Sequence, residues 1–331
     1  MPFFLNLKKR SSKNTLLDDS AAAFQSRFGG FWTDRLDALE ILSKREKKGL
    51  YSKEEAAQIR LWIKNGFLII PGAVSTGIAD RVLSDIEKIF DGKIPGGLME
   101  AGPQIIPALP EHREQRLKGL DIYTVSAAAR EAIFAPKIGE FLARIFEKPP
   151  MVFQSLQFQG GQEQPHHRDS AYVKVEPLMR FAAAWIALED IRPGSGELEY
   201  FPGSHRVEDY LFPGGSQWHT HGQEHEDFYR HLREGVAASG LKAEKFRGKK
   251  GDALLWHADL VHGGGKIEDH SFTRRSLVAH YCPFDSEPLY YRHPPHGRCL
   301  RVGEKTYLSF SGHGHGHLVE SKLNGLKSFL K

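Results

Sequence analysis

The chain has 331 residues, of which 40% are hydrophobic and 26% are charged, and its formal net charge is +4 at pH 7. This composition is typical of globular proteins that bury a sizeable core, and it excludes a largely disordered chain. The basic surplus is small and no long Lys/Arg run is present, so the sequence gives no indication of nucleic-acid binding. An anionic small substrate remains compatible with this charge.

Cys282 and Cys299 are the only cysteines, and neither lies in a Cys-x-x-Cys motif. So few cysteines exclude a disulfide framework and favour a reducing compartment. The apolar run near Met1 is too short for a signal sequence and precedes its charges. No stretch of about 18 apolar residues is present, so we expect no membrane-spanning helix and a cytoplasmic protein.

The first half of the chain is predicted to be mainly helical. Residues 1–32 show no clear periodicity and are expected to form an arm. Helical spacing of apolar residues and a capping pair, Ser52 with Glu55, then predict helices over about 36–48, 52–65, 76–91 and 136–148, with a short β-like run at 67–71. Residues 92–118 are rich in Gly and Pro and are expected to form a long irregular connection near the functional site.

The second half has the pattern of strands. Residues 181–188 form a continuous apolar run, as expected of a strand covered on both faces. Further strands are predicted at 152–158, between the turn signals of 192–205, at 253–256 and at 275–282. Residues 206–246 are interpreted as an insertion with a helix at about 224–237. Helices followed by strands, without βαβ alternation, indicate an α+β fold with an antiparallel sandwich core.

Two His-x-Asp motifs are candidates for metal binding. Residues two apart in a strand point to the same face, so His167 lies beside Asp169, and His257 beside Asp259. A further histidine would complete a 2-His-1-carboxylate triad, which holds non-haem Fe(II) and leaves positions open for substrates. His262 is the best candidate for that ligand to the first pair. Spacing alone leaves both pairs open, because an isolated His-x-Asp motif is a weak signal.

Six segments, in the same order, resemble the phytanoyl-CoA dioxygenase family of Fe(II)/2-oxoglutarate-dependent oxygenases. They are Gly66–Gly72, Gln164–Asp169, Gly196–His205, Gly251–His257, His262–Gly264 and Arg274–Tyr281. This resemblance implies that His167, Asp169 and His262 bind Fe(II) and form the catalytic centre. It also implies that an arginine twelve residues after His262 binds the cosubstrate 2-oxoglutarate.

A guanidinium group binds a carboxylate through two parallel hydrogen bonds and stays charged when buried. Arg274 and Arg275 are adjacent, so only one of them faces the interior of a strand, and the family pattern favours Arg274. Ser276 would share its face. Trp185 resembles a family tryptophan that lines the cosubstrate pocket, although a core aromatic residue on a buried strand would look the same. Gly264 stands where relatives often carry a hydroxyl group, which calls one hydrogen bond to the cosubstrate into question.

Other polar residues receive simpler interpretations. His166 is expected to point away from His167, and His205 is expected to be structural. His219, His221 and His225 lie in the insertion, and His313, His315 and His317 alternate with glycine near the C-terminus. Such Gly-His tracts are expected to form solvated loops. Three residues of or after the irregular connection could reach the cosubstrate: Lys118, Asp121 and Tyr123.

We therefore expect a double-stranded β-helix of the jelly-roll, cupin-like type, with N-terminal helices packed on one sheet and a helical lid insertion. Residues 1–50 are assigned to an N-terminal arm and helix, 51–285 to one catalytic domain with 206–246 as the lid, and 286–331 to a C-terminal extension. The sequence does not indicate an oligomeric state.

The resemblance implies hydroxylation of a small organic substrate. Fe(II) would be the metal cofactor, 2-oxoglutarate and O2 would be consumed, and succinate and CO2 would be released. Asp169 favours hydroxylation over halogenation, because related halogenases lack the acidic ligand. Two alternatives stay open: a non-redox metal-dependent cupin-type enzyme such as an isomerase, and a catalytically degenerate binding protein on the same fold. The residues that select the substrate are expected in 92–126 and 206–246.

Overall fold

The computed structural model describes residues 23–102, 104–219, 224–288, 297–302 and 305–310. Three of its helices begin after a serine whose side chain accepts a hydrogen bond from the first helical turn: Ser52, Ser75 and Ser126. The predicted capping box is confirmed, since the Ser52 side chain accepts a hydrogen bond from the Glu55 backbone and Glu55 accepts one from the Ser52 backbone. The α-helices are α1 (Ala38–Lys47), α2 (Lys53–Asn65), α3 (Thr76–Phe90), α4 (Ala127–Ile133), α5 (Pro136–Phe146) and α6 (Glu224–Ala238).

Short 3-10 helices occur at turns between these elements and the strands. They are η2 (Trp32–Asp34), η3 (Pro110–His112), η4 (Ile122–Thr124), η5 (Asp169–Ala171), η6 (Ser204–Arg206) and η7 (Pro213–Gly215). The strands are β1 (Phe67–Ile70), β2 (Leu98–Ala101), β3 (Gln104–Pro107), β4 (Lys118–Leu120), β5 (Pro150–Phe158), β6 (Gln164–His167), β7 (Val175–Glu176), β8 (Ala182–Ala187), β9 (Leu198–Tyr200), β10 (Glu244–Phe246), β11 (Ala253–His257), β12 (His262–Gly264), β13 (Ser276–Pro283), β14 (Glu287–Pro288), β15 (Gly297–Val302) and β16 (Lys305–Phe310).

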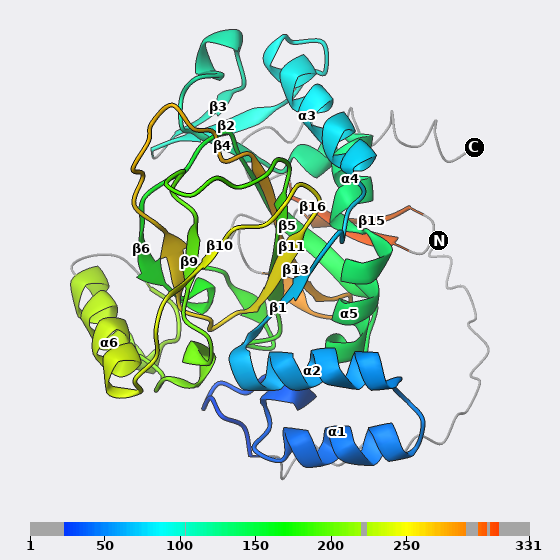
Figure 1. Cartoon of the computed structure of the whole chain (residues 1–331), viewed down its shortest axis with the longest axis vertical. Coiled ribbons are helices and arrows are strands. Elements are labelled where there is room, and N and C mark those ends of the chain that lie inside the picture. The colour runs from blue at the N-terminus through cyan, green and yellow to red at the C-terminus, as the bar shows by residue number, and fades with distance from the viewer. Residues whose placement is uncertain (1–22, 103, 220–223, 289–296, 303–304, 311–331) are drawn as a thin grey trace, which may run out of the picture.

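Two sheets form the core of the fold. The larger sheet has the order β1-β11-β8-β13-β5-β4-β2-β3, with β16 added parallel to β5 and β15 paired to β16. The smaller sheet has the order β10-β9-β12-β6, and its pairs are antiparallel. Helices α3, α4 and α5 lie on one side of the larger sheet, and the smaller sheet and α6 lie on the other (Figure 1). This confirms the predicted α+β fold with a jelly-roll core.

Strand β8 shows why the larger sheet is apolar on both faces. Its residues Ala182, Ala184 and Ile186 belong to the core formed with the helices, while Trp185 belongs to the core between the two sheets. Alternate residues of a strand point to opposite faces, so a strand covered on both sides needs an unbroken apolar run. The interpretation of residues 181–188 as such a strand is confirmed.

The prediction of an irregular connection over residues 92–118 is wrong, because short strands form there. Strands β2, β3 and β4 lie there and extend the larger sheet beyond β5. Each has only three or four residues, which is too short for alternation to be visible between Gly and Pro residues. Pro107 is tolerated because β3 is an edge strand, where a backbone N–H group is not required. The sheet extension holds Glu100 and Lys118 at fixed positions.

The described part of the expected N-terminal arm is packed into the core. Phe31 stacks on Phe146 of α5 with 4.7 Å between ring centroids, and Trp32 donates a hydrogen bond to the Arg144 backbone. Burial of these two aromatic rings fixes the segment that precedes α1 against α5. The division of the chain into an arm, one catalytic domain and an extension stays a prediction. No helix among the described residues is long and apolar enough to cross a membrane.

The insertion 206–246 contains the predicted helix, α6. Phe228, Leu232 and Val236 of α6 are buried in one cluster with Val207 and Phe212. Apolar residues at helical spacing therefore anchor the helix, as for any amphipathic helix on a core. Figure 1 shows α6 beside β6 and β9 of the smaller sheet. A lid function for this segment stays a prediction.

The packing of α5 predicts a large effect of Leu142→Ala on stability. Leu142 is fully buried, so its removal should lower the free energy of unfolding by about 2–5 kcal/mol. Leu61→Ala is a matched control, because Leu61 lies on α2 with 49% of its surface exposed and should change that free energy by less than about 0.5 kcal/mol. Urea denaturation measures both, and equal effects of the two substitutions would contradict this packing.

Candidate functional site

Pairing of β6 with β12 brings two distant histidines together. His167 is the last residue of β6, His262 is the first residue of β12, and the two are register partners. Asp169 follows as the first residue of η5, so it lies just beyond the strand and not within it as the His-x-Asp argument assumed. One ligand atom from each of the three residues lies within 4.8 Å of the others, and this is the one group of three or more candidate metal ligands among the described residues.

The glycines after His262 are required by a close approach of two backbones. A Cβ atom at Gly264 would lie 1.7 Å from the Gln162 carbonyl oxygen, and one at Gly263 would lie 2.6 Å from the Gln164 carbonyl oxygen. Both distances are far below van der Waals contact, so a side chain would force β12 away from β6. Position 264 therefore has no room for a hydroxyl-bearing side chain.

Both histidines have their ring nitrogens fixed by backbone carbonyls. The Nδ1 atom of His167 lies 2.9 Å from the Pro165 oxygen, and Nδ1 of His262 lies 2.9 Å from the Leu260 oxygen. A carbonyl only accepts, so each Nδ1 carries the hydrogen and each Nε2 keeps a lone pair. Burial lowers the pKa of His262 to about 4. The imidazole of His262 is therefore neutral at pH 7, as a metal ligand must be.

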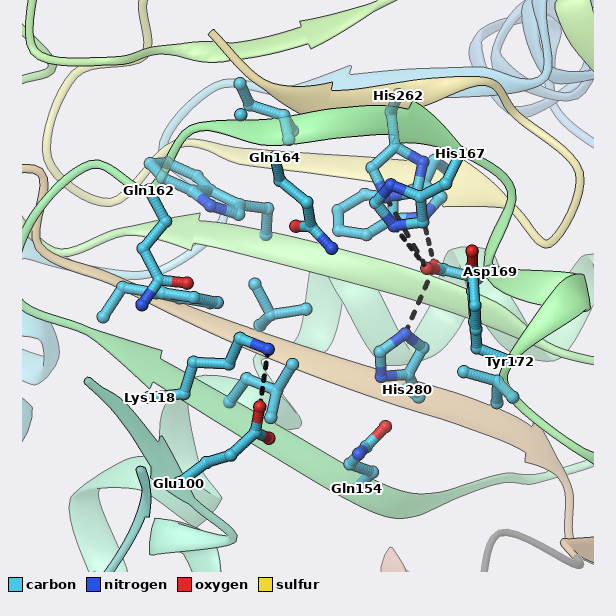
Figure 2. Close-up of a pocket in the computed structure, with 18 of the residues that line it drawn as sticks. Glu100, Lys118, Gln154, Gln162, Gln164, His167, Asp169, Tyr172, His262 and His280 are labelled. Carbon is cyan, nitrogen blue, oxygen red and sulfur yellow. Dashed lines mark hydrogen bonds and ion pairs between the residues drawn. The ribbon is translucent and has the colours of Figure 1, made fainter. Parts of the chain in front are cut away.

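The two carboxylate oxygens of Asp169 have different partners. Its Oδ2 accepts hydrogen bonds from Trp256 Nε1 at 2.8 Å and from His280 Nε2 at 3.2 Å. Its Oδ1 lies 3.6 Å from the Nε2 atoms of both His167 and His262. Figure 2 shows the three imidazoles converging on this carboxylate.

Burial alone would raise the pKa of Asp169, but its polar surroundings, in which His280 donates a hydrogen bond to Oδ2, hold the pKa well below its usual range. Asp169 is therefore an anion. Two imidazole nitrogens and one carboxylate oxygen then face one point, with each ligand oriented by a second hydrogen bond. This donor set fits a divalent transition metal such as iron.

The second His-x-Asp motif lies elsewhere. Neighbouring residues of β11 point to opposite faces, so Trp256 faces Asp169 while His257 faces the N-terminal segment. His257 Nε2 lies 3.3 Å from Asp34 Oδ1, and Asp259 accepts a hydrogen bond from the Ser170 hydroxyl. The structure therefore separates this pair from His262, a choice that spacing in the sequence left open.

A cavity of about 350 Å³ lies between the sheets, and the triad faces it. Arg274 lies at one end, only 4% exposed, with its guanidinium carbon 5.8 Å from the Phe158 ring centroid and 5.9 Å from that of Trp185. Its Nη1 donates to the Gly196 carbonyl oxygen at 2.5 Å. Among the described residues, no carboxylate lies within ion-pair distance of it, and its Nε has no partner.

Burial lowers the pKa of Arg274 to about 10, so the group remains a cation at pH 7. A buried cation without an ion-pair partner among the described residues is a candidate binding site for an anion. Arg275, the alternative, is half-buried and does not line the cavity, and its backbone N–H donates to Glu189. Ser276 is fully buried on the next strand position, but it does not line the cavity, so its contact with a cosubstrate stays a prediction.

Of the three residues expected to reach the cosubstrate from the region before α4, the structure places one in the cavity. Lys118 lines it and pairs with Glu100 at 2.9 Å, as Figure 2 shows. Asp121 is buried behind β5, where it accepts a hydrogen bond from the Ser155 backbone, and Tyr123 is also buried away from the cavity.

The histidines outside the triad lie in different environments. His166 bonds Glu199 at 3.1 Å and His205 bonds the Ile63 backbone, as expected of residues outside the triad. His225 lies on α6, within the predicted helix, and lines the cavity, which the sequence did not indicate. His219 is half-buried beside it with 3.8 Å between ring centroids. The other members of the two groups lie outside the described residues: His221, His313, His315 and His317.

Sequence reasoning missed several residues that line the cavity. His280 is one of them, although alternation along β13 places it on the same face as Val278, which also lines the cavity. Tyr172 and Tyr229 are others. Tyr229 follows His225 by one helical turn, which was a usable signal once α6 was predicted.

Comparison with known proteins agrees with this geometry. A family model described as phytanoyl-CoA dioxygenase (PhyH) matches residues 62–276. The human protein "Phytanoyl-CoA dioxygenase, peroxisomal" is 26% identical over 250 residues, which cover 69% of this chain and 68% of that protein. The mouse "Phytanoyl-CoA dioxygenase domain-containing protein 1" is 30% identical over 134 residues, which cover 39% of this chain and 45% of that protein.

Two solved structures show the same fold. One is the epimerase SnoN in complex with Fe3+, alpha ketoglutarate and nogalamycin RO, with a TM-score of 0.55, 17% identity and coverage of 77% of this chain and 98% of that chain. The other is EctD from S. alaskensis with bound Fe, with a TM-score of 0.51, 19% identity and coverage of 70% and 77%. The family match spans more than half of the sequence and includes all three residues of the triad. The chain therefore belongs to the phytanoyl-CoA dioxygenase family.

Proposed function

We propose that this protein is an Fe(II)- and 2-oxoglutarate-dependent dioxygenase that hydroxylates a small organic substrate and releases succinate and CO2. The observation that carries this proposal is the buried triad facing an uncompensated Arg274 within one cavity. Family membership supports it, as do the SnoN and EctD structures, which hold iron and, for SnoN, alpha ketoglutarate. A cytoplasmic location stays a prediction.

The triad would hold the iron through His167 Nε2, His262 Nε2 and Asp169 Oδ1. Iron bound with 2-oxoglutarate supplies the oxidation of an unactivated C–H bond by dioxygen. The protein orients the three ligands. Pro165 and Leu260 carbonyls keep both Nε2 lone pairs available, and the bonds from Trp256 and His280 hold Oδ2 so that Oδ1 faces the histidines.

Arg274 would bind the far carboxylate of 2-oxoglutarate through its guanidinium group. The rings of Trp185 and Phe158 flank this end of the cavity and exclude water, which strengthens a charge-assisted hydrogen bond. Ser276 is kept as a further candidate contact on the same strand. A non-redox cupin-type enzyme would use the triad but has no need of an uncompensated buried cation, so this arginine favours the oxygenase.

Asp169 favours hydroxylation over halogenation, because the carboxylate takes the position that a halide would need. Its two bonds to Trp256 and His280 show that the surrounding residues support a carboxylate at this position. A catalytically degenerate binding protein would have no use for a complete set of ligands with oriented hydrogen bonds, so the intact triad argues against that alternative.

Substitution of the distal histidine tests the metal site. Anaerobic addition of Fe(II) and 2-oxoglutarate to the wild-type protein should give a visible charge-transfer absorption band, and His262→Ala should abolish it because one ligand is lost. His166→Ala is the matched control, since His166 bonds Glu199 away from the triad, and it should keep the band. A band that survives in His262→Ala, or that is absent from the wild type, would refute the assignment.

Trp256→Phe tests the hydrogen bond that orients Asp169. Loss of the indole N–H should weaken Fe(II) binding by roughly 10- to 100-fold, as loss of an outer ligand contact does in other metal sites. Trp62→Phe is the control, because the Trp62 Nε1 atom is buried without a hydrogen-bond partner among the described residues. Metal titration followed by the same absorption band measures both variants, and equal affinities would show that Trp256 does not orient the ligand.

Arg274→Lys tests the cosubstrate contact. Lysine keeps the charge but loses the planar fork of donors, so the KM for 2-oxoglutarate should rise by about thirtyfold, equivalent to about 2 kcal/mol of a charged hydrogen bond. Arg275→Lys should leave that KM unchanged, since Arg275 does not line the cavity. Succinate formation at varied 2-oxoglutarate concentrations measures both, and the reverse pattern would assign the contact to Arg275.

A further inference from the structure

The cavity has a second polar region, on the Asp169 side of the site. Strand register places His280 opposite Gln154 on β5, whereas Ser276 of β13, two residues after Arg274, lies opposite Phe158. The end of the cavity near Arg274 and the end near Gln154 therefore lie several residues apart along β5 and β13. In Figure 2, Gln154, Tyr172 and His280 lie on the side of Asp169, while Lys118, Glu100 and Gln162 lie across the cavity.

Four polar side chains make up this region, which we call the polar wall: Gln154, Tyr172, His225 and Tyr229. All four line the cavity. The Tyr172 hydroxyl lies 3.2 Å from His225 Nδ1 and 3.3 Å from the Tyr229 hydroxyl, and the last two atoms are 3.2 Å apart. Three polar atoms from two segments thus form a hydrogen-bonded triangle at the cavity surface.

The polar wall is fixed relative to the metal ligands. Tyr172 follows Asp169 by three residues at the end of η5, and its ring lies edge-on to His167 with 5.9 Å between centroids. His225 and Tyr229 are one helical turn apart on α6, whose adjacent residues Phe228 and Leu232 are buried. The core that anchors α6 therefore sets the distance between the polar wall and the triad.

The polar wall has unused hydrogen-bonding capacity. A phenol has one donor and two acceptor positions, so two contacts within the triangle leave one position of Tyr172 and one of Tyr229 for a ligand. Burial, together with the bond to Tyr229, raises the pKa of Tyr172 well above its usual range, so it stays a neutral phenol. The Gln154 side chain is only 2% exposed, lines the cavity and makes no side-chain hydrogen bond with a described residue. Its amide can therefore bond a ligand in the cavity.

The chemistry of the polar wall restricts its ligand. It carries no carboxylate, ammonium or guanidinium group, and the Lys118–Glu100 pair across the cavity is internally neutralised at 2.9 Å. Phenol, amide and imidazole groups each donate and accept hydrogen bonds, and a hydroxyl group on a ligand does the same. An apolar chain would leave these groups desolvated and without hydrogen-bond partners, so its binding here would be strongly disfavoured. The cavity, at about 350 Å³, is near the lower end of the range for small-molecule sites and must also hold the cosubstrate.

We propose, on the basis of the function proposed above, that the polar wall binds the substrate and that this substrate is a small neutral compound with several hydroxyl groups. The part of the substrate that reaches the iron is then held by hydrogen bonds from Tyr172, Tyr229, His225 and Gln154. A fatty-acyl chain is not accepted at this wall.

The test compares two sets of probes on protein loaded with Zn(II) and 2-oxoglutarate, in which no oxidation occurs. One set is myo-inositol, glucose and glycerol, and the other is palmitic acid and palmitoyl-CoA. Saturation-transfer NMR should detect binding of at least one hydroxylated probe and of neither acyl probe. Binding of an acyl probe at the site, or of no hydroxylated probe, overturns the proposal.

Variants assign the binding to the polar wall. Tyr172→Phe combined with Tyr229→Phe, and separately His225→Gln, should weaken the hydroxylated probe by roughly fivefold to tenfold for each hydrogen bond lost. His231→Gln is the matched control on α6, because His231 bonds the Glu208 backbone and does not line the cavity. Unchanged binding in the double variant, with the fold verified by circular dichroism, also overturns the proposal.

The Fe(II)–2-oxoglutarate absorption band separates this proposal from the proposed function. A wild-type protein that shows the band but binds no hydroxylated probe contradicts the substrate class alone. A protein without the band contradicts the proposed function, whatever the probes do.

Discussion

The division of the Asp169 carboxylate between two sets of partners is the interaction on which the rest of the site depends. One oxygen is held by Trp256 and His280 of the larger sheet, and the other faces His167 and His262 of the smaller sheet. The carboxylate therefore joins the two sheets at one point. A small rotation of Asp169 would lose both the orienting bonds and the convergence of the ligands, which explains why both sheets must be packed firmly behind it.

The larger sheet is held in place because its two faces have different roles: one packs against helices and the other lines the cavity. Helices α3, α4 and α5 cover one face with a continuous apolar core, so β11 and β13 present Trp256 and His280 to the cavity at fixed positions. Arg274 lines the cavity from just before β13. Strands β6 and β12 face them from the smaller sheet, and Gly264 allows their backbones to approach closely. The core thus positions ligands from strands that are far apart in the sequence, as preorganised sites require.

Much of this arrangement was readable from the sequence, and the failures have physical causes. The apolar run 181–188 and the capping box at Ser52 are local signals, and both elements are present as predicted. The choice between His167 and His257 was not local, because it depends on which face of β11 meets the smaller sheet. Strands β2 to β4 are too short to show alternation, and His225 enters the cavity only through the packing of α6 on a distant core.

The triad and Arg274 predict one metal position and one orientation of the cosubstrate. A crystal structure from crystals grown anaerobically with Fe(II) and 2-oxoglutarate measures both: anomalous diffraction at the iron edge locates the metal, and the electron density shows the cosubstrate. We expect a single iron peak among His167, Asp169 and His262, with the far carboxylate of 2-oxoglutarate on Arg274. An iron peak beside His257 and Asp259, or 2-oxoglutarate bound away from Arg274, would contradict the central claim.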